Sequence, residues 1–126
     1  MKIGVPKETV ANERRVALTP EITGRLAKSG LTVLVERGAG ETASFRDEAY
    51  TAAGAQTAST AADLFAQSDV ILKVQPPSPV EVRQYRAGSA LVALFQPSAE
   101  RAAVSELAAR KVTAFSLALL PRITRA

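Results

Sequence analysis

Apolar residues along the chain fall into five short, nearly continuous runs, separated by segments in which they recur every three or four positions. The first pattern is typical of buried strands in a parallel sheet and the second of amphipathic helices. Strands are predicted at residues 3–5, 31–36, 69–74, 90–95 and 112–117. Helical segments are predicted at residues 20–28, 46–53, 60–67, 80–85 and 99–110. This alternation predicts an α/β fold with a mainly parallel sheet and helices on both faces, a three-layer α/β/α sandwich.

Two of the predicted helices carry signals at their ends. Thr19-Pro20 suits an N-cap followed by a proline in the first turn, and Ser29-Gly30 suits a helix end. Ile22 and Leu26 are predicted to lie on the buried face of this helix. Ser98 is the predicted cap of the last helix.

A glycine pair after the second predicted strand resembles a dinucleotide fingerprint, because residues 38–43 read G-x-G-x-x-A. Such a fingerprint must open a helix long enough to cross back over the sheet, with pyrophosphate at its N-terminus. Here the next helical stretch is short, begins with acidic residues and stops at Gly54. We therefore predict a tight turn at this position instead of a nucleotide loop.

Composition narrows the class of protein further. A chain of 126 residues has the length of one domain, and 47% apolar residues suit a globular core. The net charge of +4 arises from 16 scattered basic residues among 12 acidic ones, so no nucleic-acid surface is predicted. The chain has no cysteine, which excludes disulfides and thiolate metal sites, and we expect no metal site. No apolar run reaches the roughly 20 residues that span a bilayer, and Pro6 with the charges after it interrupts any signal-peptide pattern.

Two cations are predicted at the edge of the sheet where open α/β folds bind ligands. Arg15 lies in the polar loop after the first strand, and Lys73 interrupts the otherwise apolar third strand one residue before its end. A buried ammonium is costly without a partner, so we expect Lys73 to face the same crevice as Arg15. Such a pair suits a carboxylate or a carboxamide oxygen. A solvated surface loop and a lysine that reaches water remain as alternatives.

The opening of the chain, residues 2–8 with residues 12–20, resembles the start of the alanine dehydrogenase and proton-translocating NAD(P) transhydrogenase family. The resemblance continues at residues 35–40, 53–55 and 70–74 and ends at residues 121–126. It implies that residues 1–126 are a flavodoxin-like N-terminal domain. It also implies that the main nucleotide-binding loop lies in a Rossmann domain beyond residue 126. In the alanine dehydrogenase branch, the positions matching Arg15 and Lys73 hold the substrate carboxylate.

Gln96 favours the transhydrogenase branch of this family. Alanine dehydrogenases carry a catalytic histidine in the matching segment, because oxidative deamination needs a proton carrier. This chain has no histidine at all, and a glutamine cannot titrate. Transhydrogenases move a hydride directly between two nicotinamide rings, which needs positioning and no acid–base residue. We therefore expect no catalytic residue here, and we group Gln96 with Arg15 and Lys73 in one substrate-like pocket.

The resemblance also implies cofactor and partners. Arg122, Ile123, Thr124 and Arg125 resemble the transhydrogenase segment beside bound NAD(H). NADP(H) would bind a partner domain or subunit, and a homodimer joined to membrane and NADP(H)-binding subunits is expected. The protein would then be cytoplasmic and peripheral to the membrane, and the fragment alone is expected to be inactive. Two alternatives remain: an alanine dehydrogenase-like amino-acid oxidoreductase, and a non-catalytic binding or dimerisation module.

Overall fold

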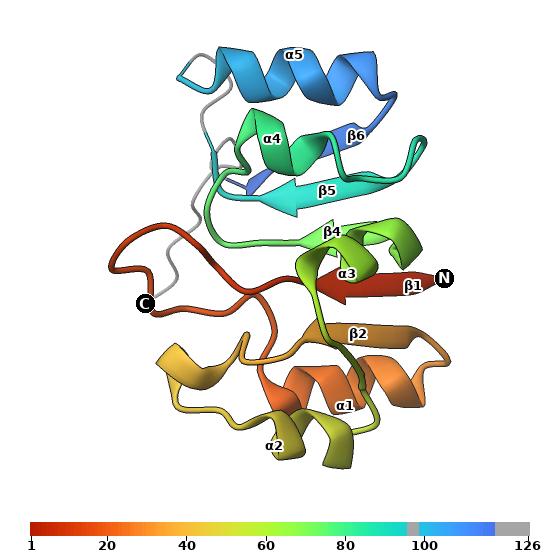
Figure 1. Cartoon of the computed structure of the whole chain (residues 1–126). Coiled ribbons are helices and arrows are strands. Elements are labelled where there is room, and N and C mark those ends of the chain that lie inside the picture. The colour runs from red at the N-terminus through yellow and green to blue at the C-terminus, as the bar shows by residue number, and fades with distance from the viewer. Residues whose placement is uncertain (96–98, 118–126) are drawn as a thin grey trace, which may run out of the picture.

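Six parallel strands form one sheet in the computed structural model, which describes residues 1–95 and 99–117 (Figure 1). Their order across the sheet is β3-β2-β1-β4-β5-β6, and every neighbouring pair is parallel. The strands are β1 (Lys2–Val5), β2 (Thr32–Glu36), β3 (Gln56–Ala58), β4 (Val70–Leu72), β5 (Ala90–Ala93) and β6 (Thr113–Ser116).

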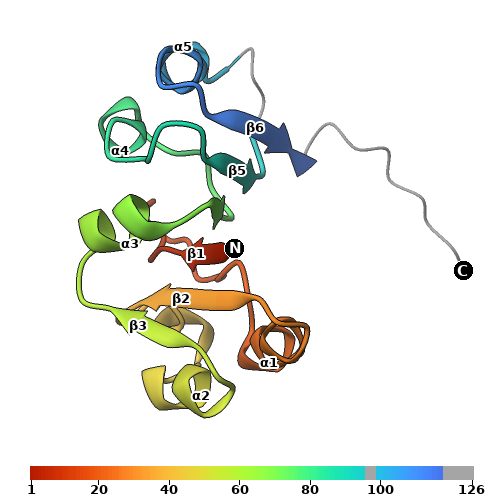
Figure 2. The ribbon, with the colours of Figure 1, turned by 90° about the vertical axis from the view of Figure 1, so that its right-hand side faces the viewer.

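Helices pack on both faces of the sheet, as the sequence predicts. Figure 2 shows α1 on one side and α3, α4 and α5 on the other, and α2 packs beside α1. The helices are α1 (Pro20–Lys28), α2 (Asp47–Ala52), α3 (Ala61–Gln67), α4 (Pro79–Val82) and α5 (Arg101–Ala109), with a 3₁₀ turn η1 (Glu41–Ala43). The α/β sandwich is confirmed.

The strand order shows where the topology reverses. The five predicted strands are all present and run in the flavodoxin-like order 2-1-3-4-5. The sixth strand, β3, was not predicted and adds one edge strand, which gives the doubly wound order 3-2-1-4-5-6. The chain leaves β1 toward β2 on one side and returns to β4 on the other. The switch point therefore lies between β1 and β4.

Local capping explains where α1 begins and ends. The Thr19 hydroxyl accepts a hydrogen bond from the Ile22 amide at 3.3 Å, and Ser29 closes α1, as predicted. The predicted burial of Ile22 is wrong, because it is 38% exposed and Thr23 is buried instead. The N-cap position of α5 belongs to Glu100 and not to Ser98, which lies outside the described residues.

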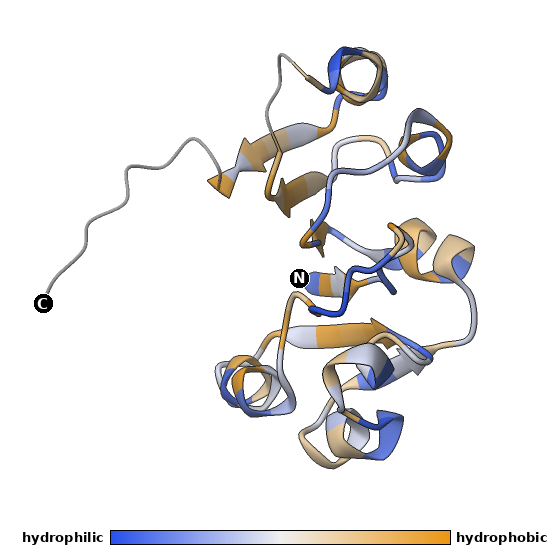
Figure 3. Ribbon diagram, turned by 90° about the vertical axis from the view of Figure 1, so that its left-hand side faces the viewer, coloured by the Kyte–Doolittle hydropathy of each residue, from blue (hydrophilic) through white to orange (hydrophobic). Residues whose placement is uncertain are grey.

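The core consists of two apolar clusters, one on each face of the sheet. Alternate residues of β2 enter opposite clusters, so that Val33 and Val35 face α1 while Leu34 faces α3. Figure 3 shows the apolar residues concentrated on the strands and the polar ones on outer helix faces and loops. Among the described residues, no helix has the length and apolar character needed to cross a membrane.

Candidate functional site

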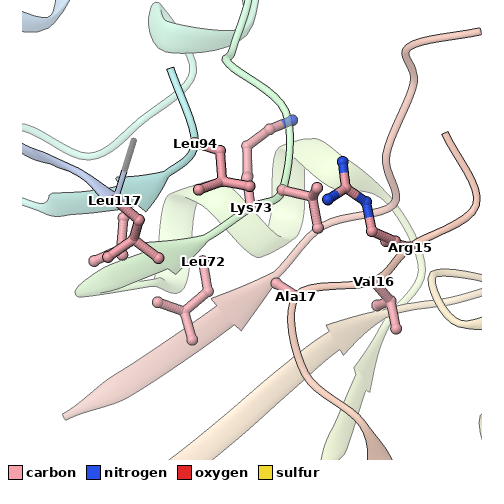
Figure 4. A pocket seen from close by; sticks show the side chains of 9 residues that line it. Arg15, Val16, Ala17, Leu72, Lys73, Leu94 and Leu117 are labelled. Atoms are coloured by element: carbon pink, nitrogen blue, oxygen red, sulfur yellow. The ribbon is translucent and has the colours of Figure 1, made fainter. Parts of the chain in front are cut away.

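A pocket of about 430 Å³ lies at the carboxyl ends of β1, β4 and β5, at the topological switch point (Figure 4). Ligands of open α/β folds bind in this position, and the volume is in the range of small-molecule sites. Aliphatic side chains form most of the wall, and two cations stand among them. The lining residues are Arg15, Val16, Ala17, Leu72, Lys73, Val74, Val92, Leu94 and Leu117.

The structure brings Arg15 and Lys73 to the same pocket, on two loops that leave neighbouring strands. The strand β4 ends at Leu72, so Lys73 is the first residue beyond it. The Lys73 side chain is only 2% exposed, which excludes the alternative of a lysine that reaches water. Its Nζ donates a hydrogen bond to Glu81 Oε1 at 3.0 Å and lies 4.0 Å from Glu8 Oε1.

Glu8 joins the two loops that line the pocket, and sequence reasoning did not identify it. Its buried carboxylate accepts hydrogen bonds from the backbone amides of Val74, at 2.9 Å, and Gln75, at 3.0 Å. Hydrogen bonds to a charged acceptor are stronger than neutral ones. Glu8 thus fixes the first loop against the segment that carries Lys73. Its only signal in the sequence was an acidic residue shortly after a strand.

Arg15 is paired with a carboxylate of its own loop. Its guanidinium donates to both oxygens of Glu13, at 2.8 and 3.0 Å, and the Gln75 amide donates to the same carboxylate at 2.6 Å. These hydrogen bonds, chiefly the one from Arg15, lower the pKa of Glu13 to about 2 from 4.5. The Arg15 side chain is 62% exposed, so the guanidinium remains accessible to solvent and to a ligand.

Glu81 is held by a second buried group. The Tyr85 hydroxyl donates a hydrogen bond to Glu81 Oε2. Burial, followed by the nearby charge of Glu81, raises the pKa of Tyr85 far above 10. Tyr85 therefore acts as a neutral hydrogen-bond donor, and the Glu81 carboxylate forms its ion pair with the Lys73 ammonium.

The charges around the pocket limit what it can bind. Two cations stand beside three carboxylates, Glu8, Glu13 and Glu81, so a pyrophosphate here would meet more negative than positive charge. The aliphatic walls, with N–H donors at one side, suit a flat apolar ring that carries a polar edge. The described residues thus suit a flat ring with a polar edge better than a phosphate group.

Five of the predicted site residues cannot be placed. Gln96, Arg122, Ile123, Thr124 and Arg125 lie outside the described residues. Within the described part of the chain, no group of three or more His, Cys, Asp or Glu side chains is arranged to hold a metal ion. The segment 38–40 forms a turn that leads into η1, as predicted, and does not open a crossing helix.

The fold and the pocket define a doubly wound α/β domain with a pocket at its switch point. Residues 4–126 match the family described as alanine dehydrogenase/PNT, N-terminal domain. The chain belongs to this family, as its sequence predicts.

Three relatives show how much of this chain, and how much of each relative, the similarity covers. The first portion of NAD(P) transhydrogenase subunit alpha from Rhodospirillum rubrum is 44% identical over all of this chain and 34% of its own length. The crystal structure of a transhydrogenase from Sinorhizobium meliloti superposes with a TM-score of 0.91 and 40% identity, over 98% of this chain and 37% of that one. An alanine dehydrogenase of Mycobacterium tuberculosis is 39% identical over 85% of this chain and 29% of its own length. The chain spans about a third of the length of these relatives.

Proposed function

We propose that this chain is the N-terminal part of the NAD(H)-binding component, the α subunit, of a proton-translocating NAD(P) transhydrogenase. One observation carries the proposal: similarity to a transhydrogenase α subunit extends over the whole chain at 44% identity. Similarity to an alanine dehydrogenase covers 85% at 39% identity, so that alternative is weaker. The absence of histidine from the chain supports the same branch.

We propose that residues 1–126 are the first of at least two domains and that the pyrophosphate binds in the second. Two features support this division. The carboxylates of Glu8 and Glu13 disfavour a pyrophosphate at the pocket, and the described residues provide no glycine-rich loop at the start of a crossing helix. The pocket of this chain would then receive the nicotinamide end of NAD(H).

The residues of the chain would position the ring and exclude water from it. When bound, the reduced nicotinamide supplies the hydride, and this chemistry needs no acid–base residue from the protein. Arg15 and Lys73 would hold the carboxamide side from the pocket edge, together with Gln96. Arg122, Ile123, Thr124 and Arg125 would contact the same end of the cofactor. The apolar side chains of Leu72, Leu94 and Leu117 would exclude water from the side of the ring opposite the carboxamide.

The partners follow from the same proposal. The acceptor NADP⁺ would bind a second domain or subunit, and a membrane component would couple hydride transfer to proton movement. The α subunits would form a homodimer at the cytoplasmic side of the membrane, attached only through these partners.

The test uses the full-length protein that contains this chain, assembled with its partner subunits. We expect hydride transfer from NADH to an NADP analogue, followed by the absorbance of the reduced analogue, and no such activity from residues 1–126 alone. Pyruvate-dependent oxidation of NADH by the full-length protein, lost on Lys73→Ala, would instead support the alanine dehydrogenase alternative. A full-length protein that binds no NADH would contradict both enzyme functions.

A further inference from the structure

Cations gather at the amino ends of the strands, on the edge of the sheet opposite the pocket (Figure 1). Each crossover helix returns the chain to the amino end of the next strand, so the ends of α1 and α5 reach this edge. Lys2 is the first residue of β1, Lys28 is the last residue of α1, and Arg110 and Lys111 follow α5. We call these four residues the basic row.

Two acidic side chains lie at the same edge, and each already has a cationic partner. Asp69, directly before β4, pairs with Arg86. Glu106, near the end of α5, pairs with Arg83 at 3.1 Å between Oε1 and Nη2. Among the described residues, no member of the basic row forms an ion pair. The two acids therefore do not compensate the charge of the row.

Neutral acceptors hold two members of the row and leave their charge in place. The Lys2 Nζ donates a hydrogen bond to Gln67 Oε1 at 3.4 Å. The Arg110 guanidinium donates to the Tyr85 carbonyl oxygen at 2.6 and 3.0 Å. Lys28 and Lys111 are exposed to solvent. The row thus carries four positive charges, as many as the net charge of the whole chain.

The basic row crosses the sheet from one half to the other. Lys28 precedes β2 and Lys111 precedes β6, and these strands are the ends of the order β2-β1-β4-β5-β6. Neighbouring strands lie about 4.8 Å apart, so the row is roughly 20 Å long. At the opposite edge, cations such as Arg37 and Arg46 stand among acidic residues such as Glu41. A row of one sign is therefore a property of the amino edge.

We infer that the basic row is a docking surface for an acidic segment of a partner subunit. A row of like charges fits an elongated partner, such as a helix with carboxylates along one side, because complementary charge guides and orients association. A membrane surface also takes up apolar side chains beside the cations. Among the described residues of this edge, only Met1 is a large, exposed apolar residue. The acidic chemistry does not rest on the proposed function, whereas identification of the partner as another transhydrogenase subunit does.

The probe for this surface is a fluorescent oligoglutamate peptide of about ten residues, long enough to cover the row. Fluorescence anisotropy measures its binding to the full-length protein at low salt. We expect Lys28→Glu with Lys111→Glu to weaken binding about tenfold, because two attractions become repulsions. Lys28→Gln with Lys111→Gln, which only removes the two charges, should weaken binding about threefold. Both losses should shrink as added salt screens the charges.

A matched control reverses two charges at the opposite edge of the sheet. Arg46 precedes α2 and Arg101 begins α5, and both are exposed and lie outside the pocket. Arg46→Glu with Arg101→Glu changes the net charge by the same amount and should bind the peptide within about twofold of the wild type. Lys28 and Lys111 lie at helix ends, where cations stabilise a helix, so urea unfolding of every variant separates lost stability from lost binding.

The second readout is the salt concentration that releases the full-length protein from its assembled partner subunits. Lys28→Glu with Lys111→Glu should lower this concentration, and the matched control should not. NADH affinity, measured by calorimetry, should stay unchanged in both double variants, because neither pair of residues lines the pocket.

Three results would overturn the docking surface: no peptide binding at low salt, equal losses in the two lysine and arginine reversals, or binding to phosphatidylserine vesicles without binding to the peptide. The last result would assign the row to a lipid surface. Peptide binding that depends on the row, with no change in the assembled complex, would support the acidic ligand and contradict the transhydrogenase subunits as its source. A protein that binds the peptide through the row but transfers no hydride would contradict only the proposed function.

Discussion

Gly4 lies in the centre of the sheet, where β1 touches the end of α3. A Cβ added at this position would overlap the Ser68 hydroxyl and would lie 2.9 Å from both Leu64 Cδ2 and Ser68 Cβ. Ser68 is fully buried, and its hydroxyl donates a hydrogen bond to the Leu64 carbonyl at 2.6 Å. The hydroxyl therefore cannot turn away without losing this bond, whereas the tip of Leu64 can shift.

Gly4→Ala should destabilise the chain by about 2–4 kcal/mol. Overpacking of a core by a methyl group costs about 1–3 kcal/mol, and loss of the Ser68 hydrogen bond adds about 1 kcal/mol. In a domain of this size, 1 kcal/mol corresponds to roughly 4 °C in Tm. We therefore expect Tm to fall by roughly 8–16 °C.

Urea unfolding, followed by far-UV circular dichroism, measures this effect against a matched control. Gly24→Ala makes the same substitution within α1, where the new Cβ would lie 3.8 Å from Ala53, an ordinary contact. The control should stabilise the chain by about 0.5–1 kcal/mol, because alanine favours a helix over glycine. Equal effects of the two substitutions would refute the reasoning.

Ser68→Ala tests which atom causes the cost. This variant removes the hydroxyl that overlaps the new methyl group and leaves Ser68 Cβ in place. In its background, Gly4→Ala should cost at least about 1 kcal/mol less than in the wild-type chain. An unchanged cost would show that the destabilisation arises elsewhere, for example in the twist of β1.

Three further predictions concern caps and ionisable groups. Thr60→Ala removes the hydroxyl that accepts from the Asp63 amide at the start of α3, and it should cost about 1 kcal/mol in urea unfolding. Burial raises the pKa of Tyr50 to about 12 from 10. Its contribution to stability is therefore complete below pH 10 and is lost as the pH rises toward 12. Tyr50→Phe should abolish this alkaline loss of stability in unfolding experiments. Glu13 has its pKa lowered to about 2 from 4.5. Its contribution to stability is therefore complete above pH 4.5 and is lost as the pH falls toward 2. Glu13→Gln should remove this loss of stability in acid.

The sequence predicted the fold where apolar residues form continuous runs. Strands such as residues 31–36 are buried on both faces, and this burial leaves a readable signal. β3 was missed because it has only three residues and lies at an edge, where Gln56 and Thr57 are exposed to solvent. Ile22 was misplaced because a nine-residue helix has few positions from which to judge its buried face.

Only the site residues that the sequence places at the ends of predicted strands could be identified in advance. Lys73 stood out because a charge inside an apolar run needs an explanation, and the common edge of parallel strands placed it near Arg15. Glu8 had no such signal, because its partners Val74 and Gln75 are 66 and 67 positions away along the chain. Contacts of this range depend on strand order, which the pattern of apolar residues did not specify.

The switch point explains why these contacts form one network. Since β1 and β4 are neighbours, the loops that follow them leave the same edge of the sheet and face each other. Glu13 accepts a hydrogen bond from Gln75 across this gap, and Glu8 binds the backbone beside Lys73. Arg15 and Lys73 are thus joined by a chain of contacts through Glu13, Gln75 and Glu8, although the two side chains belong to different loops.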